Sequence, residues 1–259
     1  KNGVWNAGLF WSCFIRPVGR AFWRHTDIWY LLTVIDMDGD FAQTLLLTGR
    51  LALATTLLLM VIGVPIAYGL SRFRSRLRPV VEAVIALPLI LPPTVLGFYL
   101  LWAFSPGNGP GGWLQEVWGA ELLFSFEGLV IGSLIYSLPF MVQPVQAGFE
   151  KLPGELSEIA YTLGASRWTA FFRIELPNIR PALLTGAVLT FAHTVGEFGL
   201  ILMIGGNIPG ETRVASIAIY DAVEGLEYAV AHQYSLVLLV FSLAVLAGVR
   251  ALSRWSWTP

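Results

Sequence analysis

The chain has 259 residues, of which 56% are hydrophobic and only 13% are charged, and its mean hydropathy is +0.68. Soluble domains carry about 25% charged residues, so this chain has too few charges to cover a globular surface. Its formal net charge of −1 provides no basic field of the kind that draws a protein to nucleic acid. The composition therefore predicts a protein embedded in a lipid bilayer.

Residues 1–43 form an N-terminal segment whose role the sequence leaves open. One interpretation is an interfacial helix anchored by Trp5, Trp11 and Trp23, and the other is the remnant of a sixth span. The single cysteine, Cys13, excludes an intrachain disulfide and a cysteine metal cluster.

Residues 44–252 are predicted to form the membrane domain. Five apolar segments in it have roughly the 17–25 residues that a helix needs to cross a bilayer. They are residues 51–70, 83–104, 128–149, 181–204 and 233–249. Helices are expected because a backbone in lipid must satisfy its own hydrogen bonds. The predicted fold class is therefore all-α, a polytopic bundle of membrane helices.

Prolines are expected to interrupt two of these spans. Pro88, Pro92 and Pro93 lie in the second span, and Pro139 and Pro144 lie in the third. Each removes a backbone donor and bends a helix, although proline is also common in membrane helices for no functional reason. Three prolines within six residues favour a distorted second helix that lines a path.

Positive charge alternates between the loops. Loop 71–79 holds four arginines and loop 150–180 holds Lys151 and three arginines, whereas loop 105–127 holds neither residue type and loop 205–232 holds one arginine. Positive loops stay in the cytoplasm. Loops 71–79 and 150–180 and the C-terminus are therefore predicted to be cytoplasmic, with the protein in the inner membrane.

Loop 150–180 carries a predicted helix–turn–helix, residues 152–177, which we call the elbow. Leu152, Leu156, Ile159 and Leu163 are spaced as one apolar stripe on a helix, and Gly164 is expected to end it as a left-handed cap. Ser166 can then cap a second short helix, which Glu175-Leu176-Pro177 is expected to stop. An ordinary membrane-surface loop is the alternative interpretation.

The elbow resembles the "EAA" loop of ABC-importer permeases. Glu158-x-Ala160, Gly164 and Ile174-x-Leu176-Pro177 match that pattern, with Ile159 as a departure at its central position. The resemblance implies a type I permease fold and a coupling helix that docks on a partner ATPase. The residues it implicates are Leu152, Glu155, Leu156, Glu158, Ile159, Ala160, Leu163, Gly164, Ala165, Arg167, Ile174, Leu176 and Pro177.

A second pattern, GEFG at 196–199 followed by GNIPGETR at 206–213, resembles molybdate permeases among the oxyanion ABC importers. Sulfate and tungstate permeases share much of it, so the anion stays open. The resemblance, which covers roughly residues 42–250, implies an extracytoplasmic binding protein that delivers the anion. Its expected contacts lie in loop 205–232, at Asn207, Pro209, Glu211 and Arg213.

The sequence contains no G-x-x-x-x-G-K-[ST] loop, so ATP and Mg²⁺ are expected to be used by two partner ATPase subunits and not by this chain. Its three histidines are scattered, so neither a metal site nor a bound cofactor is predicted. No G-x-S-x-G nucleophile motif is present either, and the chain is expected not to be an enzyme.

A second copy of the chain is expected to complete a central path, because five or six helices enclose little space. The predicted path or gate residues are Pro92, Pro93, Thr94, Ser137, Thr190, Thr194 and Glu197. Glu197 would repel a dianion, so we expect it to pair with His193, to cap a bent segment or to gate.

Two other classes of protein compete with an importer subunit. An ion-coupled secondary transporter would carry intramembrane charges and often an inverted repeat, of which the sequence shows little. A non-transporting scaffold would give no anion-dependent stimulation of a partner ATPase.

Overall fold

The computed structural model describes residues 39–106, 109–119 and 121–255, and this part of the chain is built of helices and loops without a β-strand. The expected N-terminal segment, residues 1–43, lies outside the described residues except for residues 39–43, which begin the first described helix.

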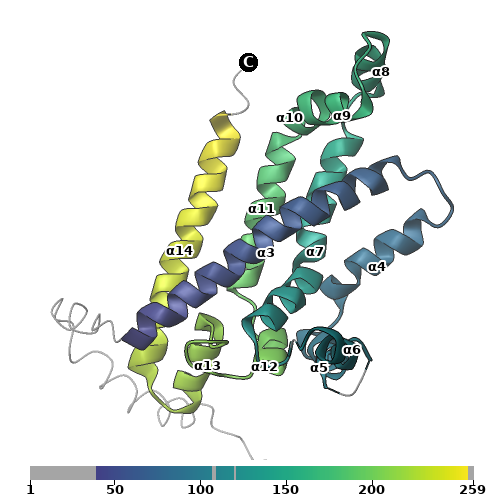
Figure 1. Cartoon of the computed structure of the whole chain (residues 1–259). Helices are drawn as coiled ribbons and strands as arrows, with labels where there is room; N and C mark the ends of the chain where they lie inside the picture. The colour runs from purple at the N-terminus through teal and green to yellow at the C-terminus, as the bar shows by residue number, and fades with distance from the viewer. Residues whose placement is uncertain (1–38, 107–108, 120, 256–259) are drawn as a thin grey trace, which may run out of the picture. The chain divides into compact units, whose positions relative to one another are not determined.

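Three long helices run through the bundle: α3 (Gly39–Arg72), α7 (Phe126–Glu150) and α14 (Tyr228–Trp255). By length and composition, α3, α7 and the part of α14 up to Gly248 can each cross a membrane. α3 crosses α7 and α11 (Arg180–Val195) obliquely, and the C-terminal end of α14 points toward the same end of the bundle as the elbow (Figure 1).

Two further spans are broken. α4 (Arg78–Ile90) and α5 (Pro93–Phe104) meet at a bend of 106°, and α11 meets α12 (Gly199–Gly205) at 61°. Counting each bent pair as one span gives five candidate spans among the described residues. Pro92 is the N-cap of α5 and Pro93 its first residue, so these prolines interrupt the second span as expected.

The prediction that prolines interrupt the third span is wrong, because α7 continues through Pro139 and Pro144. Pro88 likewise lies inside α4. α7 packs against α3 and α11. Such packing allows a membrane helix to tolerate the loss of the backbone hydrogen bond that each proline removes.

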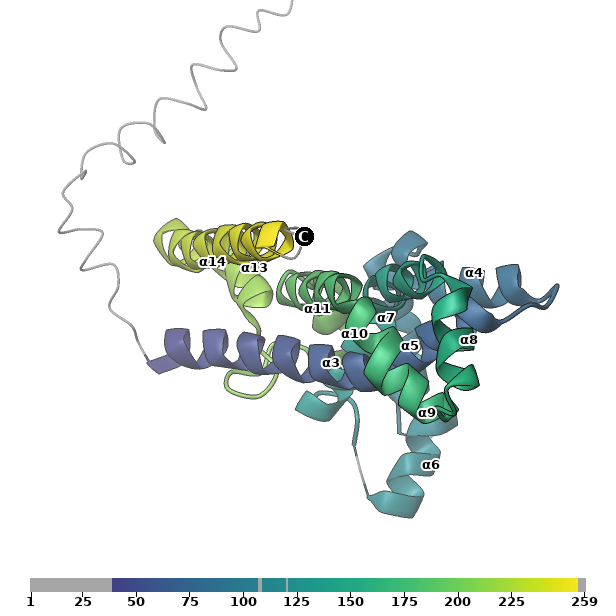
Figure 2. The same ribbon diagram turned by 90° about the horizontal axis from the view of Figure 1, so that it is seen from above.

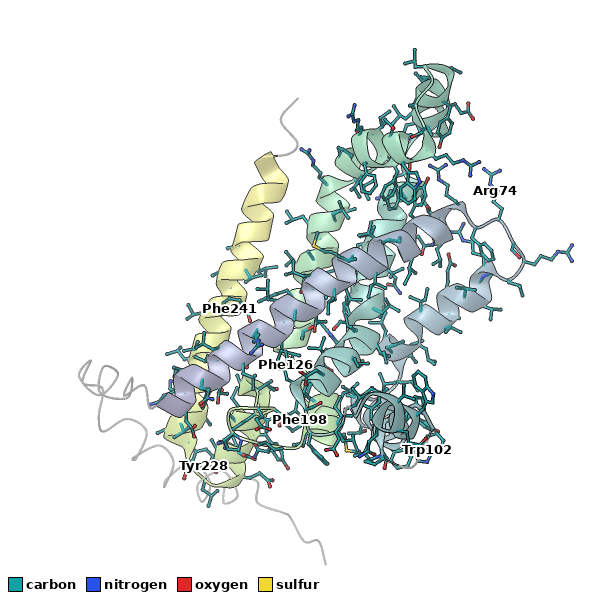
Figure 3. All side chains as sticks on the ribbon, in the orientation of Figure 1. Arg74, Trp102, Phe126, Phe198, Tyr228 and Phe241 are labelled. Atoms are coloured by element: carbon teal, nitrogen blue, oxygen red, sulfur yellow. The ribbon has the colours of Figure 1, made fainter. Side chains whose placement is uncertain are left out.

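Short helices occupy the two ends of the bundle. The elbow contains α8 (Gly154–Thr162), α9 (Arg167–Ala170), the π-helical η1 (Phe171–Glu175) and α10 (Leu176–Asn178). The opposite end holds α5, α6 (Gly109–Trp118), α12 and α13 (Ala215–Glu224) (Figure 1). Arg74, in the arginine-rich loop, lies at the elbow end, whereas Trp102, Phe198 and Tyr228 lie at the other (Figure 3).

Small residues bring the central helices into close contact. A Cβ on Gly63 of α3 would lie 2.9 Å from Met141 Cγ of α7, and one on Gly148 of α7 would lie 2.6 Å from Ala182 Cβ at the start of α11. Membrane helices commonly pack through such residues, because the backbones can approach closely. Seen from above, α14 lies at one edge of the bundle beside α11 and α13, and α4 lies at the other edge beside α7 (Figure 2).

Candidate functional site

The turn of the elbow is a Schellman motif built on Gly164. This residue has φ +83°, in the left-handed region, directly after the C-cap Leu163. The Gly164 N–H donates to Tyr161 O at 3.0 Å, and the Ala165 N–H donates to Ala160 O at 2.9 Å. These two bonds satisfy carbonyl groups at the end of α8. The predicted glycine cap is therefore confirmed.

The second half of the elbow starts as predicted but does not stop where predicted. The Ser166 side chain accepts a hydrogen bond from Thr169 N at 3.2 Å and caps α9. The chain then widens into the π-helix η1, in which Leu176 N bonds to Phe171 O, and continues into α10. Pro177 lies in the first turn of α10, where a missing N–H is tolerated, so it does not end the helical path.

One face of the elbow is apolar and has no covering partner within the described residues. Leu163 is 83% exposed, Trp168 is 74% exposed and Ile159 is also exposed. Trp168 stacks on Phe172 with their ring centroids 6.0 Å apart. Contiguous exposed apolar side chains mark interaction surfaces. This face is therefore available to bind another protein.

The remaining predicted coupling residues divide into two groups. Glu155, Glu158 and Arg167 are exposed beside the apolar face. Leu152 and Leu176 pack against the buried cluster formed around Val64, Met141 and Val145, and thereby hold the elbow on the bundle. The other buried or half-buried members of this second group are Leu156, Ala160, Ala165, Ile174 and Pro177.

An apolar groove of about 670 Å³ opens between α3 and the elbow. Met60, Val61 and Val64 of α3 line it together with Trp168 and Phe172. The lining is mostly apolar. Tyr68, Arg167 and Trp168 carry its side-chain hydrogen-bond donors, and Arg167 is the one charged residue among them, which does not balance the two charges of a dianion. We do not assign the groove to the transported anion.

The two helix breaks lie against each other. Gly199 is the first residue of α12, and a Cβ there would lie 3.1 Å from Pro93 Cβ and 3.7 Å from Thr94 Cγ2. Gly97 of α5 similarly faces Met203 of α12. The structure thus brings the predicted path residues Pro93 and Thr94 next to the GEFG segment, while Pro92 and Thr94 are exposed.

The other predicted path residues lie buried between α7 and α11. Ser137 Oγ is 3.1 Å from Thr194 Oγ1 and 3.0 Å from His193 Nδ1, and Thr194 Oγ1 also donates to Thr190 O at 3.0 Å. Thr190 Oγ1 is buried without a partner. Ser137 and Thr194 therefore bind each other between α7 and α11, and all three side chains are buried and do not face an open surface.

Glu197 lies at the break between α11 and α12 and is 3% exposed. Its Oε2 accepts a hydrogen bond from Ser133 Oγ at 2.9 Å, and its Oε1 has no partner. The expected pairing with His193 is wrong, because the two side chains bind different serines of α7. Sequence reasoning missed Ser133, although Ser133 and Ser137 are one turn apart and so share a helix face.

Loop 206–214 is closed by hydrogen bonds of Thr212 and turns at two glycines. Thr212 is buried and donates to Gly205 O at 2.6 Å, and it accepts from Ile208 N at 3.1 Å. Gly206 and Gly210 have φ of +65° and +79°, so this conformation favours glycine at both positions.

Four residues of this loop were expected to contact a binding protein. Asn207 and Arg213 both donate hydrogen bonds to Asp221 of α13, and the bond from Arg213 is 2.9 Å long. These two side chains therefore hold the loop against α13. Pro209 and Glu211 are exposed at the opposite end of the bundle from the elbow. The described residues contain no group of three or more metal-ligating side chains.

These features define an all-α, multi-pass membrane protein whose described residues include two broken spans and a helical elbow that leaves one apolar face uncovered. Residues 59–257 match the family model described as "binding-protein-dependent transport system inner membrane component". The chain belongs to this family, whose members are transport components of the inner membrane.

Curated relatives cover most of the chain. It is 51% identical over 210 residues to the molybdenum transport system permease protein ModB of Azotobacter vinelandii, covering 81% of this chain and 92% of the relative. It is 31% identical over 241 residues to the sulfate transport system permease protein CysT of Escherichia coli K12, covering 93% and 84% respectively.

Solved structures support the fold. A crystal structure of a bacterial alginate ABC transporter in complex with its periplasmic protein matches with a TM-score of 0.74 at 19% identity, covering 95% of this chain and 88% of that chain. The inward-facing MetNI methionine ABC transporter matches with a TM-score of 0.60 at 16% identity, covering 82% and 94%. The predicted type I permease fold is confirmed.

Proposed function

We propose that this chain is the permease subunit of an ATP-driven importer that moves molybdate across the inner membrane. The observation that carries this proposal is the 51% identity to a molybdenum permease along 92% of that protein's length. Identity to the sulfate permease is 31%, which makes sulfate the second candidate. Tungstate, an oxyanion of chemistry similar to that of molybdate, is a further candidate.

The elbow is the site at which a partner ATPase is proposed to act. Its exposed apolar face, with Ile159, Leu163 and Trp168, is flanked by the charged side chains of Glu155 and Arg167. An apolar centre with a charged rim is the usual anatomy of a protein–protein interface. The sequence contains no nucleotide-binding loop, so ATP and Mg²⁺ would be bound by two such ATPase subunits.

The two ends of the bundle indicate where the remaining partners would bind. The elbow, the arginine-rich loop and the C-terminal end of α14 lie at one end, and the positive-inside rule makes this end cytoplasmic. Loop 206–214 lies at the other end, where Pro209 and Glu211 would meet an extracytoplasmic binding protein. A second copy of the chain would complete the path.

ATP-driven approach of the ATPase subunits would displace the elbows and rock the helix bundles between outward and inward access. The two broken spans, which meet at Pro93, Thr94 and Gly199, are the proposed path-lining region. Broken helices inside membrane proteins typically line a substrate path.

The test is copurification of the chain with its neighbouring subunits, followed by ATPase assays with a binding protein loaded with molybdate, tungstate or sulfate. Stimulation by molybdate above sulfate is expected. Stronger stimulation by sulfate would favour the second candidate. Uptake that survives ATP depletion but collapses with the proton gradient would contradict the importer and favour a secondary transporter.

Replacing Glu197 with glutamine should slow uptake by roughly fivefold without altering the preference among anions. The variant keeps the shape of the side chain but weakens the hydrogen bond from Ser133, which fixes the α11–α12 break against α7. The measurement is the molybdate-to-sulfate uptake ratio at equal protein amounts. A changed ratio would place Glu197 in direct contact with the anion and contradict this role.

A further inference from the structure

Glu175 is the buried carboxylate of the elbow, with only 1% of its surface exposed. Its Oε1 accepts hydrogen bonds from Arg72 Nη2 and from Ser157 Oγ, each at 2.5 Å. Arg72 ends α3, Ser157 lies in α8 and Glu175 ends η1, so three segments meet at one oxygen atom. We call Arg72, Ser157 and Glu175 the clasp.

An aromatic contact lies beside the clasp. Tyr68, one turn before Arg72 on α3, packs edge-on against Phe171 with their ring centroids 4.8 Å apart. Arg72 also lies over the Tyr68 ring, 5.3 Å from its centroid. Phe171 and Glu175 begin and end η1, so the π-helical turn presents both side chains to the last turns of α3. Such π segments occur frequently at functional sites.

The other half of α3 contacts the opposite end of the bundle. Thr48 Oγ1 accepts a hydrogen bond from Ala215 N, the first residue of α13, at 2.8 Å. Gly210 of loop 206–214 lies so close to Gln43 that a Cβ would be 2.7 Å from its Nε2. At 1.5 Å of rise per residue, Thr48 and Arg72 are about 36 Å apart along one helix. α3 therefore joins the elbow to loop 206–214 through direct contacts.

We propose that Glu175 is a positioning residue for energy coupling, because the clasp makes α3 move with the elbow. A displacement of the elbow is then carried along α3 to α13 and loop 206–214, where the anion is delivered. A continuous packed helix that contacts both sites supplies the physical connection that such coupling needs. This inference rests on the proposed function of the elbow.

The first test compares the number of anions taken up per ATP hydrolysed in proteoliposomes that hold the complete transporter. Glu175→Gln and Arg72→Gln are each expected to lower this ratio about tenfold, while their ATPase subunits remain bound. In the double variant, the number of anions taken up per ATP should fall no further than in the worse single variant, because both substitutions remove the same contact. Glu150→Gln breaks the Arg78–Glu150 ion pair between α4 and α7 and is the matched control, expected to behave as wild type.

A wild-type ratio in Glu175→Gln, or losses that add in the double variant, would overturn the inference. If the wild-type complex took up no oxyanion, the proposed function would fail instead. A second measurement tests the clasp apart from transport.

That measurement is the distance between spin labels at Gly69→Cys in α3 and Thr162→Cys in α8, in a Cys13→Ser background and in the assembled complex. Both positions are exposed. In the wild type, the distribution of distances between the two labels should be narrow and should be the same with and without a non-hydrolysable ATP analogue. In Glu175→Gln this distribution should broaden. A distribution in Glu175→Gln as narrow as that of the wild type would overturn the proposal.

Discussion

Replacing Gly164 with valine is expected to uncouple ATP hydrolysis from anion uptake. Gly164 has φ +83°, a conformation that costs an L-residue about 1–2 kcal/mol and a β-branched residue more. Nothing lies within 4 Å of a Cβ at this position, so the cost comes from the backbone and not from crowding. The turn would relax and move Leu163 and the start of α9 from their present positions.

The measurement is the ratio of uptake to ATP hydrolysis in proteoliposomes with equal amounts of each variant. Gly164→Asn is the matched control, since asparagine enters the left-handed region far more readily than valine. We expect Gly164→Val to retain hydrolysis and lose most uptake, and Gly164→Asn to stay closer to wild type. Normal uptake by Gly164→Val would mean that the elbow does not need this turn.

Replacing Gly128 with alanine is expected to remove most of the folded protein from the membrane. A Cβ on Gly128 would lie 1.7 Å from the Leu122 carbonyl oxygen, and this backbone atom cannot rotate away. The same carbonyl accepts a hydrogen bond from Ser125 Oγ at 2.9 Å, while Ser125 caps α7 by accepting from Gly128 N at 3.1 Å. Crowding of this kind costs about 1–3 kcal/mol, and loss of the cap adds about 1 kcal/mol.

The measurement is the amount of monodisperse protein after detergent extraction, together with its melting temperature. Gly69→Ala is the control, because Gly69 is an exposed helical position with nothing within 4 Å of a Cβ. Gly69→Ala should match or slightly exceed wild type, as alanine favours helix. Equal yields of Gly128→Ala and Gly69→Ala would contradict the capping geometry.

Features with a local residue signature were predictable from the sequence. Gly164 was predicted because a left-handed helix cap selects glycine, and Ser166 because an N-cap selects a short hydroxyl side chain. The break before Pro93 follows from the missing proline N–H. In each case, the physical cause acts within a few residues of the chain.

Features that depend on tertiary contacts were not predictable. Pro139 and Pro144 suggested an interruption, but packing against neighbouring helices keeps α7 continuous. The clasp joins Arg72 to Glu175 across 103 positions of sequence, and no local pattern marks such a pair. The contact between the two helix breaks, through Pro93 and Gly199, is equally remote in sequence.

The polar residues between α7 and α11 show why path-lining side chains could not be recognised from the sequence. Ser137, Thr190 and Thr194 were chosen because small donors suit a weakly polar path. Such side chains also suit hydrogen bonding between membrane helices, and in this structure Ser137 and Thr194 bond to each other in that way, whereas the Thr190 hydroxyl has no partner. Sequence alone does not distinguish these two uses, because both select the same residue types.

Energy coupling in the proposed importer depends on a separate ATPase that binds the elbow from the cytoplasm. Leu163, which is 83% exposed at the turn of the elbow, is the position that tests this most directly. A photoreactive amino acid at residue 163, activated in intact cells, is expected to crosslink to the ATPase subunit of the transporter. It should also be inaccessible to a membrane-impermeant reagent added outside the inner membrane. Labelling from that outer side, or a crosslinked product that lacks an ATPase, would contradict the account.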